Sequence, residues 1–170
     1  MANRTQSTAR NVTAATGLVA LAICTGWLAT GLLDGPWGMV SGGRLEGPAV
    51  GCETARWEDF AATRELELEV RPENPRSMTT WLVVHEGALY IPADFLTPWK
   101  RWPHQVLADD RVRIRLGRQI FECSVERVAD EPKIEALRRA IAAKYDLDPD
   151  GREARIEVWW FRAGPRGSIP

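Results

Sequence analysis

Apolar and polar residues alternate over three stretches of the chain, with a period that is typical of β-strands with one buried face. In 64–71 leucine and valine alternate with three glutamates, and in 111–116 valine, isoleucine and leucine alternate with three arginines. In 119–128 phenylalanine, cysteine and valine share one face. The pattern predicts three strands, and we expect the glutamates and arginines of the first two to lie on solvated faces.

Three further strands are predicted from composition and turn residues. Residues 77–85 are continuously apolar at their centre, which indicates a central strand. A tight turn at Glu86-Gly87 joins it to a strand over 88–92. An aromatic-rich stretch over 155–162 predicts the last strand, because aromatic residues favour pleated, half-buried positions.

Two helices complete the predicted elements. A short one covers about 103–109, and a longer one begins after Asp130, whose carboxylate is a favoured N-cap group. The longer helix places apolar residues on one face at spacings of three and four: Ile134, Leu137, Ile141 and Tyr145. The order of six strands and two helices predicts a mainly β (α+β) domain over 63–163. It fits a six-stranded antiparallel barrel with helices across its openings, followed by a loose tail over 164–170.

The amino-terminal part of the chain predicts a membrane anchor. After a short tail over 1–11, residues 12–33 contain no charge. As a helix this segment reaches ~33 Å, enough for a hydrocarbon core of ~30 Å. We expect one retained transmembrane helix; a cleaved signal peptide is the alternative. A connector rich in glycine and proline follows over 34–62; we expect its part over 34–51 to run along the membrane surface and 57–62 to form one helical turn.

Charge sets the expected orientation and excludes one class of partner. Arg4 and Arg10 precede the apolar segment, so the amino terminus is expected in the cytoplasm and the domain on the outer or periplasmic side of the cell membrane. Trp27 and Trp37 are expected near the outer membrane interface, as in aromatic belts. The net charge of the whole chain is −1, which argues against a nucleic-acid partner.

The three cysteines, at positions 24, 52 and 123, do not have the spacing of metal ligands. Cys52 and Cys123 are free to pair in an oxidising compartment, but nothing in the sequence places them together.

A basic and aromatic cluster precedes the strand over 111–116. It consists of Trp99, Lys100, Arg101, Trp102 and His104. From Trp102 to Val112 the chain reads W-x-H-x-V-L-A-D-x-x-V, which resembles the segment W-x-x-N-L-x-A-x-P-x-V of the flavin and deazaflavin split-barrel proteins. That superfamily includes the pyridoxamine-phosphate-oxidase-like proteins and the deazaflavin-dependent nitroreductases. The resemblance covers about 63–145 and implies the split-barrel fold.

The resemblance also implies a cofactor, FMN or deazaflavin, and a set of residues that bind it. These are Arg76, Ser77, Thr79, Lys100, Arg101, Trp102 and His104. In this hypothesis Lys100 and Arg101 bind a phosphate, since cationic side chains are charge-assisted donors. Ser77 and Thr79 hydrogen-bond the phosphate or the ring edge, and Trp102 packs against the domain or the ring.

Two functions stay open at this point. The first is a membrane-anchored oxidoreductase that transfers hydride to a small or lipophilic acceptor with flavin or deazaflavin. The second is a cofactor-free accessory or interaction subunit of a membrane protein assembly; the departures from the motif at Gln105, Val106 and Asp110 favour it. A weaker third idea is haem bound by His85 or His104. The resemblance further implies a homodimer, and membrane lipid is the other expected partner.

Overall fold

The computed structural model describes residues 34–37, 40–94, 100–148 and 156–167. The predicted transmembrane helix over 12–33 and the tail over 1–11 lie outside these residues. Within the described ranges, none of the helices is both long and apolar enough to cross a membrane.

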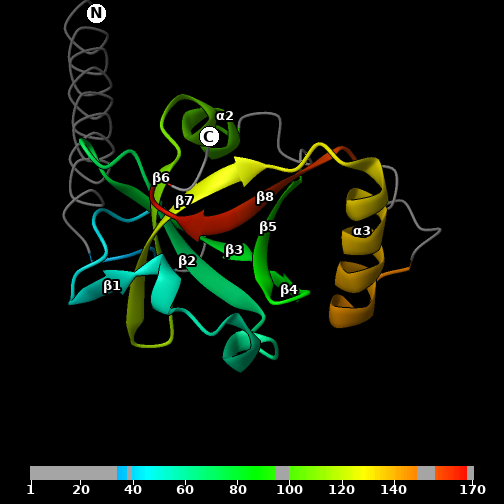
Figure 1. Cartoon of the computed structure of the whole chain (residues 1–170). Coiled ribbons are helices and arrows are strands. Elements are labelled where there is room, and N and C mark those ends of the chain that lie inside the picture. Colours follow the sequence, from blue (N-terminus) through cyan, green and yellow to red (C-terminus); the bar gives the residue numbers. More distant parts are fainter. Residues whose placement is uncertain (1–33, 38–39, 95–99, 149–155, 168–170) are drawn as a thin grey trace, which may run out of the picture.

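The described chain is mainly an antiparallel sheet with two α-helices, an α+β fold (Figure 1). Strand β1 pairs with β7 in parallel, and the other pairs are antiparallel in the order β3-β2-β6-β7-β8-β5-β4. The strands are β1 (Ala49–Gly51), β2 (Glu65–Val70), β3 (Arg76–Trp81), β4 (Val83–His85), β5 (Ala88–Asp94), β6 (Arg111–Leu116), β7 (Gln119–Arg127) and β8 (Val158–Pro165). The helices are α2 (Trp102–Ala108) and α3 (Glu131–Tyr145), with the 3-10 turns η1 (Cys52–Thr54) and η2 (Trp57–Phe60). The prediction of a six-stranded barrel is therefore wrong in strand number, and the sheet is not closed.

The extra strand in the middle of the chain arises at Leu82. We expected one strand over 77–85, but Leu82 separates β3 from β4. Its N–H donates to the Tyr145 hydroxyl (3.1 Å), and its carbonyl accepts from Lys144 Nζ (3.0 Å). Both backbone groups thus bond to α3 rather than to a neighbouring strand. As a result β3 lies at one end of the sheet order and β4 at the other, although only one residue separates them along the chain.

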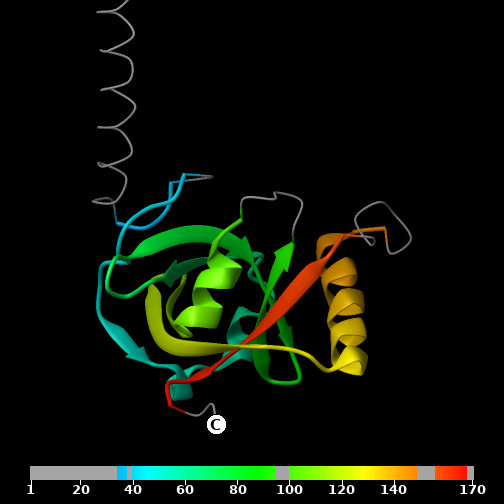
Figure 2. The ribbon, with the colours of Figure 1, turned by 90° about the horizontal axis from the view of Figure 1, so that it is seen from above.

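The sheet carries a hydrophobic core on each face. The inner core contains α2, η1 and η2, whereas the outer core lies beneath α3. Strand β8 contributes to both, because Trp160 belongs to the outer core and Phe161 to the inner one. Figure 2 shows α2 within the curve of the sheet and α3 on the far side of β8. Strand β8 therefore has α2 on one face and α3 on the other.

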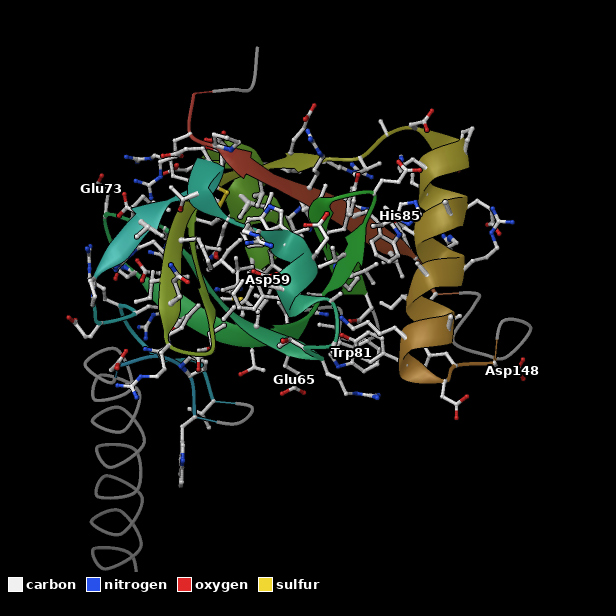
Figure 3. All side chains as sticks on the ribbon, turned by 60° about the horizontal axis from the view of Figure 1, so that its bottom comes forward. Asp59, Glu65, Glu73, Trp81, His85 and Asp148 are labelled. Atoms are coloured by element: carbon white, nitrogen blue, oxygen red, sulfur yellow. A yellow bond between two sulfur atoms is a disulfide. The ribbon has the colours of Figure 1, made fainter. Side chains whose placement is uncertain are left out.

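The α3 helix confirms the sequence prediction at both ends. The Asp130 side chain accepts a hydrogen bond from the N–H of Lys133 (2.9 Å), as an N-cap does. At the carboxyl end, the Tyr145 ring stacks on Trp81 with ring centroids 4.4 Å apart, beside α3 (Figure 3). Burial raises the pKa of the Tyr145 hydroxyl, so it remains a neutral partner for Leu82. The last strand begins and ends three residues later than expected, so Gly164 and Pro165 pair with β7.

The charged face of β2 and β6 is covered in part: Glu65 and Arg111 are exposed, as expected, but the expectation of a solvated face is wrong for Glu69 and Arg113. The Glu69 residue is only 2% exposed, and the side chain of Arg113 only 12%. Residues 34–37 and 40–46, which we call the 34–46 loop, lie over this face. Glu69 accepts from the N–H of Leu45 (2.7 Å), and Arg113 donates to the Leu45 carbonyl (2.7 Å). We expected a connector over 34–62, yet this part packs on the sheet and contributes β1 and η1, and the helical turn expected over 57–62 is present as η2.

Two ends of the 34–46 loop meet at its base. Asp34 accepts hydrogen bonds from the N–H of Glu46 (2.8 Å) and from Arg115 (2.7 Å). The bond from the Glu46 N–H and the nearby Arg115 hold the pKa of Asp34 below its usual value. Gly42 exchanges two backbone hydrogen bonds with Ser77 of β3. A Cβ at Gly42 would lie 1.7 Å from the carbonyl oxygen of Gly35, so only glycine fits there.

A disulfide joins Cys52 of η1 to Cys123 of β7. Both cysteines belong to the inner core and are buried. The bond therefore ties the segment before β2 to the centre of the sheet.

Candidate functional site

The candidate site lies where α2 meets the beginning of β8 and the end of β7. Side chains of β7 alternate, so Phe121, Cys123 and Val125 face the inner core and Arg127 follows on the same side. In β8 the inner positions are Trp159, Phe161 and Ala163. The helix α2 packs on this inner face through Trp102 and Val106. The accessible residues of α2, of the end of β7 and of the start of β8 form one surface, which we call the mouth.

The Trp159 ring is the centre of this cluster. The Arg127 guanidinium lies over it at 3.9 Å from the ring centroid, a cation–π contact. His104 of α2 approaches it edge-on, with ring centroids 5.0 Å apart and an interplanar angle of 74°. The indole N–H donates to Glu157 (2.7 Å), which fixes the orientation of the ring. A half-buried aromatic ring, a planar cation and an imidazole therefore come together from three elements.

The cations predicted to bind phosphate differ in their surroundings. Lys100 donates to Asp94 at the end of β5 (2.7 Å), so its charge is already compensated. Arg101 is exposed directly before α2. Of the two, Arg101 is the better placed to meet an anionic ligand from solvent.

Trp102 lies in the inner core rather than on a ligand surface. It is 5% exposed and packs against Phe161, with ring centroids 5.2 Å apart. Its large apolar side chain anchors α2 to β8, which leaves His104 on the exposed side of the same short helix.

The predicted residues of β3 divide between the two faces of the sheet. Ser77 is opposite Glu69 in the β2–β3 register, so it points to the outer face, and Thr79 follows it there. Ser77 is fully buried, is held to Gly42 and has no described partner for its hydroxyl. Arg76 alternates with Ser77 and shares the inner face with α2. Of the predicted residues of β3, Arg76 therefore points to the face on which α2 packs, whereas Ser77 and Thr79 do not.

The residues that sequence reasoning missed are Arg127 and Trp159. Trp159 could have been proposed from the sequence, because it is one of several aromatic residues in the predicted last strand. Nothing in the sequence points to Arg127, because only the pairing of Arg127 with Phe161 in the β7–β8 register brings it over the indole. The two histidines do not converge: by strand alternation His85 faces the outer side of β4, whereas His104 belongs to α2 on the inner side. No group of metal-ligating side chains occurs among the described residues.

A hollow lies away from this cluster, at the other end of β7. It is open, has a volume of about 450 Å³ and is mostly apolar. The residues that line it are Pro48, Val50, Phe60, Leu116, Gly117, Arg118 and Gln119. Its only charged side chain is that of Arg118, so it offers little chemistry beyond apolar contact.

Comparison with solved structures finds proteins whose backbones follow a similar course at low sequence identity. A FAD-binding protein from Mesorhizobium loti is 18% identical, with a TM-score of 0.45 over 64% of this chain and 84% of that one. A conserved hypothetical protein from Mycobacterium tuberculosis is 20% identical, with a TM-score of 0.49 over 71% and 85%. An F420 reductase is 15% identical, with a TM-score of 0.47 over 65% and 93%.

No protein-family model and no curated protein matches the sequence. At these identities and scores the similar structures transfer no ligand and no reaction to this chain.

Proposed function

We propose that the protein is a membrane-anchored oxidoreductase that binds flavin or deazaflavin at the mouth beside α2 and passes hydride to a small or lipophilic acceptor. The observation that carries this proposal is the convergence of Arg127 and His104 on Trp159, next to the exposed Arg101. The anchor in the proposal rests on the uncharged segment over 12–33.

The residues at the mouth fit a planar, anionic cofactor. Flat aromatic and guanidinium groups suit the stacking of a fused ring, and arginine suits phosphate because it presents its donors in a planar fork. Arg101 and Arg127 would hold the phosphate, while Trp159 would pack along the ring system. His104 would donate a hydrogen bond to the ring edge or to the acceptor.

The chemistry of such a site is divided between cofactor and protein. When bound in its reduced form, a flavin or deazaflavin would supply the hydride and become oxidised as the acceptor is reduced, and the protein would supply binding and orientation. The aromatic wall formed by Trp102 and Phe161 beneath the mouth keeps water away from that side of the site.

The disulfide supports a location of the domain outside the cytoplasm, because such bonds persist in oxidising compartments. That location agrees with the orientation expected from Arg4 and Arg10.

The test is a titration of the purified full-length protein in mild detergent with FMN and with deazaflavin, followed by the visible spectrum and by fluorescence quenching. We expect saturable binding that the double variant Arg101→Gln/Arg127→Gln weakens by about tenfold or more, because two charge-assisted contacts are removed. Arg118→Gln removes the same charge at the other end of β7 and serves as the control. Equal binding by the double variant and the control would place the cofactor elsewhere.

A cofactor-free accessory subunit is the second candidate, and one observation favours it. Of the seven predicted ligands, Ser77 and Thr79 point to the outer face, Trp102 is in the core and Lys100 is paired with Asp94. A protein that stays colourless and binds neither cofactor, yet retains membrane proteins through a mild-detergent purification, would support this function and contradict the first.

A further inference from the structure

The apex of the 34–46 loop presents two exposed apolar side chains. Trp37 is 81% exposed and Val40 is 47% exposed. They lie opposite each other in an antiparallel bridge, so their side chains share one face. The backbone N–H of each donates to the carbonyl of the other, both at 3.0 Å. The apex therefore combines apolar side chains with backbone groups that are already hydrogen-bonded.

The base of the same loop is fixed to the sheet. Asp34 is bonded to Arg115, which is in turn bonded to Glu67 (2.5 Å). Leu45 is fully buried and bonded to Glu69. These contacts with β2 and β6 hold both ends of the loop, so the apex has a defined direction relative to the domain.

The position of the loop along the chain indicates what the apex meets. Thirty-three residues precede Asp34, and the last 22 of them, 12–33, are uncharged and mostly apolar. If that segment crosses a bilayer, the chain leaves the hydrocarbon core at Asp34, three residues before Trp37. Tryptophan is enriched at the membrane–water interface, where its apolar body and polar N–H are both satisfied.

We propose that Trp37 and Val40 contact the interfacial region of the lipid bilayer and that the clamped 34–46 loop sets the orientation of the domain on the membrane. The backbone N–H and carbonyl groups of Trp37 and Val40 keep their partners when these two residues enter the interface, which lowers the cost of placing them there. The inference rests on the membrane anchoring in the proposed function and is independent of its cofactor.

The experiment uses the full-length protein reconstituted into vesicles of phosphatidylcholine and phosphatidylglycerol whose acyl chains are brominated near the carboxyl end. Bromine quenches tryptophan fluorescence only at short range, so the quenched amplitude reports residues at that depth. The quenched amplitudes of the wild type, Trp37→Phe and Trp81→Phe are compared. Trp81 is the other exposed tryptophan of the described chain, 42% exposed on β3 beside α3, and is the matched control.

We expect Trp37→Phe to lose part of the quenched amplitude and Trp81→Phe to retain all of it. An unchanged amplitude in Trp37→Phe, with the protein in the vesicle fraction, would overturn the lipid contact. Trp37 emission that is blue-shifted but not quenched would overturn it in favour of a protein partner. Recovery of the protein outside the vesicle fraction would overturn the anchor as well. Titration of the same vesicles with FMN separates these results from a failure of the cofactor site.

Discussion

At the scale of single residues, the burial of Glu69 and Arg113 depends on a segment distant in sequence that covers them. Their alternation with apolar neighbours predicts a solvated face, yet the 34–46 loop buries both side chains. A buried carboxylate is tolerable only with donors close to it, and the Leu45 N–H and Arg113 provide them. The pair therefore holds the loop in register on the sheet.

Position 42 of the loop has room for glycine but not for a residue with a Cβ atom. Gly42→Ala is expected to lower the free energy of unfolding by roughly 1–3 kcal/mol, because its methyl group would overlap the backbone of Gly35. The measurement is urea denaturation, combined with hydrogen exchange at Ser77. Gly164→Ala is the control, since a Cβ there meets nothing within 4 Å. Equal stability of the two variants would show that the loop does not depend on this close approach.

At the scale of elements, the local patterns predict most of the secondary structure. The strands β2, β6 and β7 follow from period-two alternation, and the start of α3 follows from Asp130, because these signals depend on neighbouring residues alone. The break at Leu82 is not visible in the same way. It depends on Lys144 and Tyr145, more than 60 residues further along the chain.

The candidate site shows the same limit. The cluster at Lys100–His104 is readable from sequence, but the face toward which Ser77 points depends on the β2–β3 register. The contact of Arg127 with the Trp159 ring also depends on the pairing of β7 with β8. The disulfide likewise needs η1 and β7 side by side, which spacing alone does not predict.

The junction between α3 and the β3–β4 break leads to a prediction at this scale. Tyr145→Phe removes the acceptor of the buried Leu82 N–H, which is expected to cost about 1–3 kcal/mol of stability. Hydrogen exchange at Leu82 should accelerate more than exchange in β6. Trp81→Phe keeps the hydroxyl and changes only the stacked ring, so it should leave the protection of Leu82 in place. Unaltered protection in Tyr145→Phe would mean that the hydroxyl does not hold the break.

At the scale of the whole molecule, the disulfide connects the amino-terminal part of the fold to the centre of the sheet over a separation of 71 residues. Removing a cross-link of this kind typically costs about 2–4 kcal/mol, because the unfolded chain regains freedom. We expect Cys52→Ala/Cys123→Ala to show that loss in urea denaturation. A reductant should lower the stability of the wild type similarly and leave the double variant unchanged. Cys24→Ala is the control; a loss of equal size in that variant would contradict the assignment of the bond.

The position of Leu82 has a further consequence for how the fold tolerates change. Residues 76–81 set the alignment of one end of the sheet against β2, and residues 83–85 set that of the other end against β5. Because a single residue joins them, an insertion within 76–85 cannot be absorbed locally: it displaces side chains from one face to the other at one of the two ends. The turn at Gly117-Arg118, in contrast, joins two strands at an exposed tip and can lengthen without disturbing either. Lineages of this fold should therefore vary in length at the β6–β7 turn and keep the length of 76–85 constant.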